Sequence, residues 1–242
     1  AVIGLVLGIT LLRNERDLSA EEIYDLVAPA TVEIQVERID GTATGTGFFF
    51  SSNGWIVTNY HVIEDGWSGY VVLSNGEEYD IINVMGYDKE RDIAILDIGY
   101  TPETVLRKRT TPVTTGETVY ALGSSLGLTG SFSEGMISTA ERELEGVTYL
   151  QTTAPISHGN SGGPLVDTHG NVVGITTAGF MDGQNLNLAV PIDYVEEVST
   201  DNPMPLKYEP KPNEKYVAVS AIEWPFLYEE NGVYKGIYAD IV

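Results

Sequence analysis

Cysteine is absent from this sequence of 242 residues. Its absence excludes disulfide bonds, thiolate metal sites and a cysteine nucleophile. Histidine occurs only three times, and no two of these residues have the spacing of zinc ligands. We therefore expect a protein that uses no metal ion and no other cofactor.

Positive charge is also scarce. The sequence has 13 Lys and Arg residues against 35 Asp and Glu residues, so its formal net charge is -22 at pH 7. Because a surface that binds phosphate groups needs clustered positive charge, we expect no nucleic-acid partner, and docking onto anionic lipid is disfavoured. The acidity predicts a solvated surface that repels itself.

No hydrophobic run reaches the roughly 20 residues that span a bilayer. The run at residues 1–12 (AVIGLVLGITLL) is apolar throughout and charged residues follow it abruptly. We expect it to be the remnant of a membrane anchor or signal segment, with a buried terminal strand or helix as the alternative. An anchor predicts an extracytoplasmic protein, held at a membrane or cell surface.

Short alternating segments dominate the rest of the chain, whose hydrophobic content of 43% is typical of a globular protein. A capping box at Ser19 and Glu22 predicts one helix over 20–27. Turn signals such as Asn53-Gly54 separate the segments that follow, which predicts antiparallel β-sheets in a sandwich or barrel. The expected strands are 32–36, 46–50, 55–58, 70–73, 79–84 and 93–98, then, after a break near 101–115, 118–122, 132–138, 149–153, 163–166, 172–177 and 186–190, with a closing helix over 193–198.

The pattern changes again after residue 198. Residues 199–215 contain four prolines, which predicts an extended linker. Residues 216–242 follow with a strand at 217–221 and a hairpin turned at Asn231 and Gly232. Because this segment is too short to bury a core of its own, we expect the truncated start of a separate domain.

The most informative motif is residues 159–165 (GNSGGPL), which set Ser161 among glycines just before an apolar strand. Such a turn exposes a hydroxyl and directs backbone N–H groups toward whatever that oxygen attacks. A serine nucleophile needs a base, and the base needs an orienting acceptor. His61, at the end of a strand, is the candidate base, and Asp92, at the start of one, is the candidate orienting group. Asp88 and Asp97 are the rival carboxylates.

A second glycine motif, residues 123–127 (GSSLG), fits the nucleophile pattern of α/β-hydrolases. That fold requires long helices between its strands and the chain order serine, acid, histidine. Neither occurs in this sequence, so we do not expect that fold.

The order His61, Asp92, Ser161 and the motifs around these residues resemble the trypsin-like serine proteases, and most closely their HtrA (high-temperature-requirement) branch. The matching motifs are TNYHV at 58–62, DIA at 92–94 and GNSGGPL at 159–165, with TGTGF at 44–48 similar to the strand before the histidine. The resemblance covers about residues 18–198. It implies an all-β fold of two six-stranded antiparallel barrels with the active site between them, and a catalytic triad of His61, Asp92 and Ser161.

The resemblance further implies an oxyanion hole made by the backbone N–H groups of Gly159 and Ser161. It places the primary substrate pocket at Ile156, Thr177, Ala178, Gly179 and Phe180. None of these residues is charged, so cleavage of polypeptides, including unfolded protein, after small or aliphatic residues is expected. The alternative is that Ile156 and Phe180 are ordinary core residues. A homo-oligomer is compatible with the resemblance.

Residues 216–242 resemble the start of an extracytoplasmic solute-binding domain, in which an aromatic residue at the position of Phe226 or Tyr228 can pack on the ligand. This segment does not resemble the PDZ domain that many HtrA relatives carry after the linker. A domain of the solute-binding kind would take a small solute as its partner. The resemblance to a solute-binding domain also suggests an alternative function for the protein, a sensor or binding protein that uses the protease fold as a scaffold.

Overall fold

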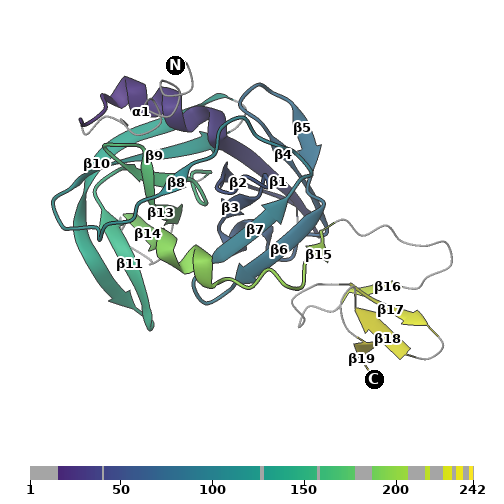
Figure 1. Ribbon diagram of the computed structural model, residues 1–242. Coiled ribbons are helices and arrows are strands. Elements are labelled where there is room, and N and C mark those ends of the chain that lie inside the picture. The colour runs from purple at the N-terminus through teal and green to yellow at the C-terminus, as the bar shows by residue number, and fades with distance from the viewer. Residues whose placement is uncertain are drawn as a thin grey trace, which may run out of the picture.

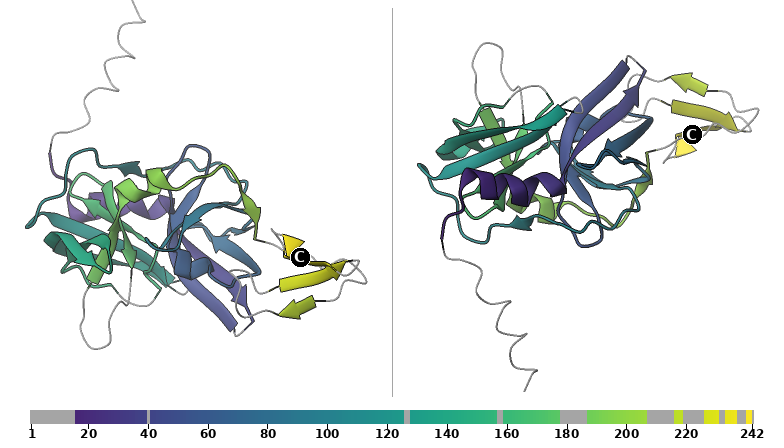
Figure 2. Two further views of the ribbon diagram at one scale, coloured as in Figure 1. Left: turned by 90° about the horizontal axis from the view of Figure 1, so that it is seen from below. Right: turned by 90° about the horizontal axis from the view of Figure 1, so that it is seen from above.

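The strands assemble into two main sheets, one for each half of the chain up to residue 206 (Figure 1). The computed structural model describes residues 16–39, 41–125, 128–156, 159–177, 187–206, 216–218, 226–230, 233–236 and 240–241. The sheets form two lobes that lie side by side (Figure 2). The expected all-β fold with few, short helices is confirmed: one lobe is an expected six-stranded barrel, and the other is a curled sheet in place of a closed barrel.

Helix α1 (Ala20–Val27) begins where the capping box predicts. The Glu22 N–H donates to the Ser19 hydroxyl at 3.2 Å, and the Ser19 N–H donates to the Glu22 carboxylate at 2.9 Å. The helix runs into the 3-10 turn η1 (Ala28–Ala30) at Pro29. Although α1 precedes the first lobe in sequence, it lies against the second, where the Tyr24 and Phe132 rings meet edge to face at 5.6 Å (Figure 2).

The first lobe is a curled sheet with the strand order β15-β6-β7-β3-β2-β1-β4-β5. Its members are β1 (Thr31–Arg38), β2 (Gly41–Phe49), β3 (Ile56–Thr58), β4 (Ser68–Val72), β5 (Glu78–Asp80), β6 (Asn83–Asp88), β7 (Ile93–Asp97) and β15 (Met204–Pro205). The short helix α2 (Tyr60–Ile63) directly follows β3.

The single strand expected over 79–84 is wrong, because the chain crosses between two edges of the first sheet there. The Ile81 N–H donates to Gly69 O at 2.9 Å beside β4, whereas the Ile82 N–H donates to Asp97 O at 2.9 Å at the end of β7. β5 therefore pairs with β4, and β6 pairs with β7. Because Ile81 and Ile82 are consecutive, these two bonds hold strands from opposite ends of the strand order close together, and the sheet curls.

The second lobe closes into a six-stranded barrel, because β12 pairs with both β9 and β13. The strands are β9 (Thr118–Ser125), β10 (Leu128–Leu144), β11 (Val147–Thr152), β12 (Pro164–Asp167), β13 (Asn171–Thr177) and β14 (Asn187–Pro191), and β8 (Arg107–Lys108) adds a parallel pairing to β13. Along β9, Val119 and Ala121 pack inside the barrel, while Tyr120 and Leu122 join the larger core shared by both lobes. This alternation is the period of two that the sequence predicts.

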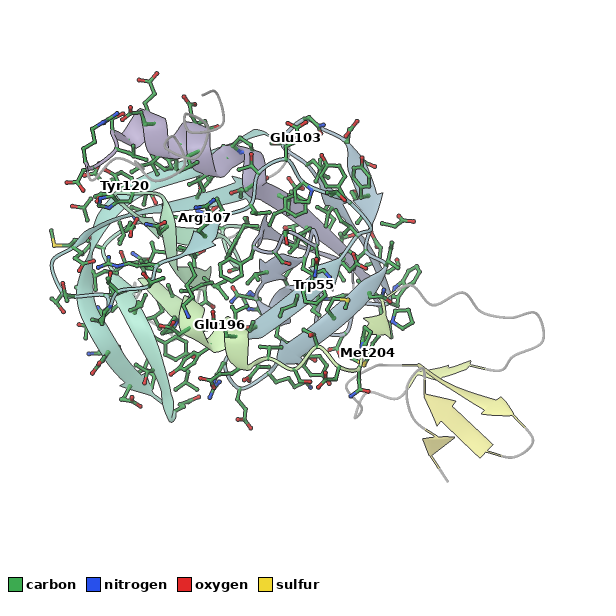
Figure 3. The ribbon with its side chains drawn as sticks, in the orientation of Figure 1. Trp55, Glu103, Arg107, Tyr120, Glu196 and Met204 are labelled. Atoms are coloured by element: carbon green, nitrogen blue, oxygen red, sulfur yellow. The ribbon has the colours of Figure 1, made fainter. Side chains whose placement is uncertain are left out.

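The segment expected to be a linker begins as part of the first lobe. After η2 (Ile192–Glu197), a 3-10 helix at the place of the expected closing helix, Met204 and Pro205 form β15 and pair with Val84 and Asn83. Leu206 is 1% exposed, and its N–H donates to Ile82 O at 3.2 Å. Met204 marks this edge in Figure 3. Sheet pairing and apolar burial thus hold residues 204–206 on the first lobe.

A third sheet contains β16 (Tyr216–Ala218), β17 (Phe226–Glu230), β18 (Val233–Gly236) and β19 (Asp240–Ile241). β17 and β18 are antiparallel and flank residues 231–232, as the hairpin prediction requires. Within the part of the chain that the structure describes, no helix is long and apolar enough to cross a membrane. The expected anchor remnant at 1–12 lies outside that part.

Candidate active site

His61 lies on α2, directly after the buried strand β3, and Asp92 holds it at two points. The His61 N–H donates to Asp92 Oδ1 at 2.8 Å, and His61 Nδ1 lies 2.8 Å from Asp92 Oδ2. A carboxylate accepts, so Nδ1 carries a proton, and in the neutral ring Nε2 then has the lone pair. The His61 side chain is 41% exposed and that of Asp92 only 9%, so the base can be reached while its orienting group is shielded.

Asp92 occupies the turn before β7 with a φ of 58°. This left-handed conformation is uncommon for a residue with a side chain, although Asp tolerates it better than most. The Asn59 side-chain amide donates to Asp92 O at 2.9 Å, and the Thr177 hydroxyl donates to Asp92 Oδ2 at 3.2 Å. The backbone and the side chain of Asp92 are therefore both held by residues from other parts of the fold.

Sequence reasoning did not foresee these two supporting residues. Asn59 lies within the TNYHV motif around His61, and this position was the one feature of the sequence that could have indicated its role. Thr177 was expected only in the substrate pocket, and in the structure its hydroxyl also donates to Asp92. Because Thr177 belongs to the second barrel and Asp92 to the first lobe, no local pattern could have joined them.

The rival carboxylates bond within their own turns. Asp88 accepts the Arg91 N–H at 2.9 Å and lies 3.8 Å from the Arg91 guanidinium. Asp97 accepts the Gly99 N–H at 3.0 Å, in the turn after β7. The described contacts of their side chains thus serve local turns, whereas those of Asp92 reach His61.

Ser161 lies in the turn at residues 159–163, and the three carbonyl groups around it are each held. Gly159 O accepts the Thr46 hydroxyl at 2.6 Å, and Ser161 O accepts the Thr46 N–H at 2.8 Å. Between them, Asn160 O accepts the Thr176 hydroxyl at 2.7 Å and the Gly163 N–H at 3.0 Å. Each peptide group is planar, so a fixed carbonyl also fixes the N–H group on its opposite side.

Position 162 requires glycine for two reasons, its backbone conformation and the lack of space for a Cβ. Its φ is +87°, and a Cβ there would lie 2.1 Å from Thr46 O and 2.2 Å from Thr58 Oγ1. The same close approach sets the turn against the end of β3, which leads into His61. Together with the bond from Thr177 to Asp92, it brings the segments that carry His61, Asp92 and Ser161 to one place between the lobes.

The expected substrate pocket is described only in part. Ile156 is half-buried beyond the end of β11, and Thr177 is buried at the end of β13. Ala178, Gly179 and Phe180 lie outside the described residues. Gly159, expected in the oxyanion hole, has a φ of +92°.

Tyr149 of β11 also lies near the candidate site. Burial, and after it the negative charge of Asp92, raise the pKa of the Tyr149 phenol. The phenol is neutral at physiological pH already at its ordinary pKa of 10, and this shift favours the neutral form further, so it adds no second negative charge near Asp92.

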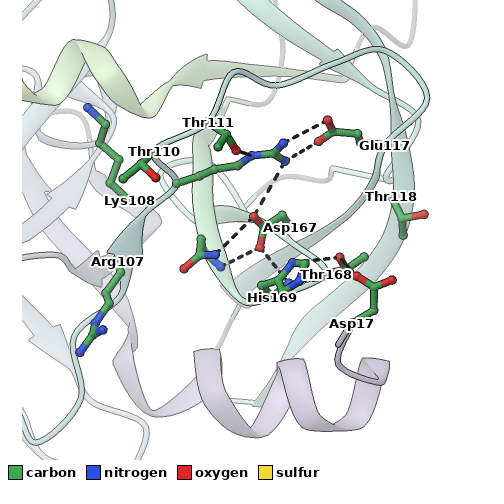
Figure 4. A pocket seen from close by; sticks show the side chains of 12 residues that line it. Asp17, Arg107, Lys108, Thr110, Thr111, Glu117, Thr118, Asp167, Thr168 and His169 are labelled. Carbon is green, nitrogen blue, oxygen red and sulfur yellow. Dashed lines mark hydrogen bonds and ion pairs between the residues drawn. The ribbon is translucent and has the colours of Figure 1, made fainter. Parts of the chain in front are cut away.

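A separate cavity of about 680 Å³ lies on the second lobe, lined by none of the candidate catalytic residues (Figure 4). Arg109 is paired with two of the acidic groups in it: its guanidinium donates to Glu117 at 3.1 Å and lies 3.9 Å from Asp167. Bonding to Arg109 is the main cause that holds the pKa of Glu117 below its ordinary value of 4.5. Among the described residues, no group of three His, Asp or Glu could hold a metal ion.

Comparison with known proteins assigns the family. The family model of the trypsin-like peptidase domain matches residues 45–175, a span that contains His61, Asp92 and Ser161. The chain belongs to the trypsin-like peptidase family. Curated proteins named as HtrA or DegP-like serine proteases match the chain, so this trypsin-like peptidase is of the HtrA type.

Two of these relatives come from mammals and one from a bacterium. "Serine protease HTR4" of Rattus norvegicus is 35% identical over 197 residues, covering 74% of this chain and 39% of the relative. "Serine protease HTRA4" of Homo sapiens is 31% identical over 229 residues, with coverages of 88% and 47%. "Probable periplasmic serine endoprotease DegP-like" of Bartonella henselae is 36% identical over 186 residues, with coverages of 71% and 35%. This HtrA-type chain thus spans less than half the length of each of these relatives.

Solved structures agree with that assignment. The HtrA-type protease AlgW with a tripeptide is 30% identical, with a TM-score of 0.66, and the match covers 74% of this chain and 62% of that one. The serine endoprotease from Yersinia pestis is 30% identical with a TM-score of 0.64, and the coverages are 76% and 66%.

Proposed function

We propose that this HtrA-type chain is a serine endopeptidase that cleaves polypeptides through an acyl-enzyme. The observation that carries the proposal is the double contact of the Asp92 carboxylate with the His61 N–H and ring, both at 2.8 Å. A histidine held in this way, beside a glycine turn that carries a serine, is suited to take a proton from that serine. The names of the HtrA relatives add to this support.

In the proposed first step, Ser161 Oγ attacks the carbonyl carbon of the scissile peptide while His61 Nε2 takes the hydroxyl proton. The imidazolium then gives this proton to the leaving amine, and the C–N bond breaks to leave an acyl group on Ser161. A water molecule then attacks the acyl carbon while His61 takes its proton. The bond from the acyl carbon to Ser161 Oγ breaks, His61 returns the proton to Oγ, and the carboxylic acid product leaves. Asp92 stays ionised throughout, holds the tautomer and stabilises the imidazolium.

The negative charge that forms on the substrate oxygen is proposed to meet the N–H groups of Gly159 and Ser161. The held carbonyl of Asn160 supports this role for Ser161, because the Ser161 N–H points away from that carbonyl within the same planar peptide. One such donor typically lowers the barrier by about 3 kcal/mol, because it is already oriented when the charge appears.

We further propose cleavage after small or aliphatic residues, with Ile156 and residues 177–180 around the side chain that precedes the scissile bond. The uncharged character of these residues supports this preference over Lys or Arg. Unfolded polypeptide is the proposed substrate class, and a homo-oligomer is the proposed assembly. The periplasmic relative supports an extracytoplasmic setting, with residues 1–12 as the proposed membrane tether.

For the domain organisation, we propose that residues 18–206 form the protease and that 216–242 begin a solute-binding domain. The pairing of β15 with β6 moves the proposed boundary beyond residue 198. The separate strand order of the third sheet supports a second domain. A sensor that uses the protease lobes as a scaffold is the other function this organisation allows.

The decisive experiment is Ser161→Ala, assayed on unfolded protein and with a fluorophosphonate label. We expect kcat to fall about 10⁶-fold and labelling to stop, while the far-UV circular dichroism spectrum is unchanged. Ser125→Ala, in the second glycine motif, is the control and should keep both activities. Wild-type turnover by Ser161→Ala would sink the proposal, and a wild-type chain that never reacts with the label would favour the sensor.

A further inference from the structure

Thr46 of β2 crosses from the first lobe to the turn that carries Ser161. It is fully buried, and its neighbour Gly45 leaves room for the approach. A Cβ at position 45 would lie 2.6 Å from Val62 Cγ2 and 3.3 Å from Ser161 O. A larger residue there would push the strand away from the turn.

The polar groups of Thr46 bond to three other segments. Its N–H donates to Ser161 O at 2.8 Å, and its carbonyl accepts the Thr58 hydroxyl at 2.7 Å. Its own hydroxyl donates to Gly159 O at 2.6 Å and accepts the Ser124 N–H at 2.8 Å. The hydroxyl therefore joins the end of β9 to the Ser161 turn, and the backbone joins that turn to the strand before His61.

We propose that Thr46 is a positioning residue for catalysis: its hydroxyl holds the Gly159 carbonyl, and thereby the turn that presents Ser161 and the oxyanion donors. The proposal rests on the proposed function, since it deepens the account of the same site. Thr46 Oγ1 fixes the peptide plane after Gly159, and Thr46 N–H fixes the plane after Ser161. The two bonds enclose the Asn160–Ser161 peptide, so a loss at one end lets the nucleophile shift.

A side chain with the shape of threonine but without its hydroxyl cannot make these hydrogen bonds. Valine has the size of threonine but neither donates nor accepts, so Thr46→Val leaves the Ser124 N–H and the Gly159 carbonyl without that partner in a buried place. Serine keeps the oxygen and loses only the methyl group, which lies near Gly163. The pair of variants thus separates hydrogen bonding from packing.

The kinetic signature follows from what Thr46 does not touch. Its described bonds reach neither Ile156 nor Thr177, so KM should change by less than about three-fold. It does not touch the contact between His61 and Asp92, so the pH dependence of kcat should keep its midpoints. A displacement of the nucleophile by about 1 Å can cost on the order of 10²-fold, so for a displacement of up to this size kcat of Thr46→Val should fall about 10- to 100-fold.

The test compares Thr46→Val and Thr46→Ser in the full chain with Thr31→Val as the matched control. Thr31 is also buried on the β1–β2 pair, and its hydroxyl donates to Val27 O at 3.0 Å, away from the Ser161 turn. We expect Thr46→Ser to restore kcat to within about three-fold of wild type and Thr31→Val to keep it, although both valine variants lower Tm. Full kcat in Thr46→Val, or an equal loss in Thr31→Val, would overturn the proposal.

Amide hydrogen exchange separates this proposal from the proposed function. In Thr46→Val the Ser124 amide should exchange at least about ten-fold faster than in wild type, and in Thr31→Val it should not. If wild type shows no turnover, the endopeptidase proposal fails, and unchanged exchange at Ser124 then overturns the role of Thr46 as well. If Thr46→Val does not fold, Thr46→Ala replaces it under the same comparisons.

Discussion

At the scale of single residues, both the backbone and the side chain of Asp92 are constrained. Its backbone has a φ of 58°, its carboxylate accepts from His61 and Thr177, and its carbonyl accepts from Asn59. A left-handed residue of this kind costs about 1–2 kcal/mol, which the surrounding hydrogen bonds offset. Strain kept in place by residues from both lobes is typical of a functional position.

Asp92→Asn should lower kcat about 10⁴-fold near neutral pH, because the amide can donate to the ring and so favours the wrong imidazole tautomer. Its fold should survive, since Asn also tolerates a positive φ. Asp88→Asn and Asp97→Asn are the controls, and each should keep kcat within about ten-fold, because their described bonds stabilise only local turns. If either control lowers kcat as much as Asp92→Asn does, the Asp92 carboxylate is not the group that orients His61.

At the scale of elements, the Ser161 turn depends on close backbone approach. Gly162→Ala should destabilise the fold by at least about 3 kcal/mol, because the new Cβ meets two oxygens in addition to the cost of a positive φ. Gly76→Ala is the matched control, since Gly76 has a φ of +84° with nothing within 4 Å of a Cβ. It should cost only about 1–2 kcal/mol in urea unfolding. Equal losses would mean that the crowding around Gly162 is relaxed at no cost.

The ion pair between Arg109 and Glu117, which joins the segment after β8 to the start of β9, should depend on pH. Because folding lowers the pKa of Glu117 from 4.5, its contribution is full above pH 4.5 and is lost as the pH falls through the folded value. Glu117→Gln should therefore lower the free energy of unfolding at pH 7 by about 1 kcal/mol, and by less at pH 3.

Glu103→Gln, at an exposed position in the same connecting region, is the control for this pH dependence (Figure 3). It should change the free energy of unfolding little at either pH. A loss in Glu117→Gln that grows toward pH 3 would contradict the predicted sign.

At the scale of the whole molecule, the pairing of β15 sets the smallest stable protease. A chain ending at Leu206 should keep kcat/KM and Tm, whereas a chain ending at Pro203 loses β15 and the buried Leu206. Burial of one leucine side chain contributes about 2 kcal/mol, which corresponds to a fall in Tm of roughly 5 °C for a domain of this size. Differential scanning calorimetry of both chains checks this, and equal melting points would place the boundary back near residue 198.

The sequence by itself determined the local features of this protein. The capping box set the start of α1, alternation predicted most strands, and the glycine motif singled out Ser161, with His61 and Asp92 as its candidate partners. Each of these signals depends on residues within one turn or strand, where backbone geometry and side-chain chemistry act over a few positions.

Only the tertiary structure decided which distant segments meet. It divided the expected strand at Ile81 and Ile82, drew residues 204–206 into the first sheet, and placed Thr177 on Asp92 and Thr46 on the Ser161 turn. A hydroxyl or an N–H group in the sequence has many suitable partners, and the choice among them follows from which strand edges the closed core brings together. That choice is a property of the whole packed chain, so no local pattern in the sequence could contain it.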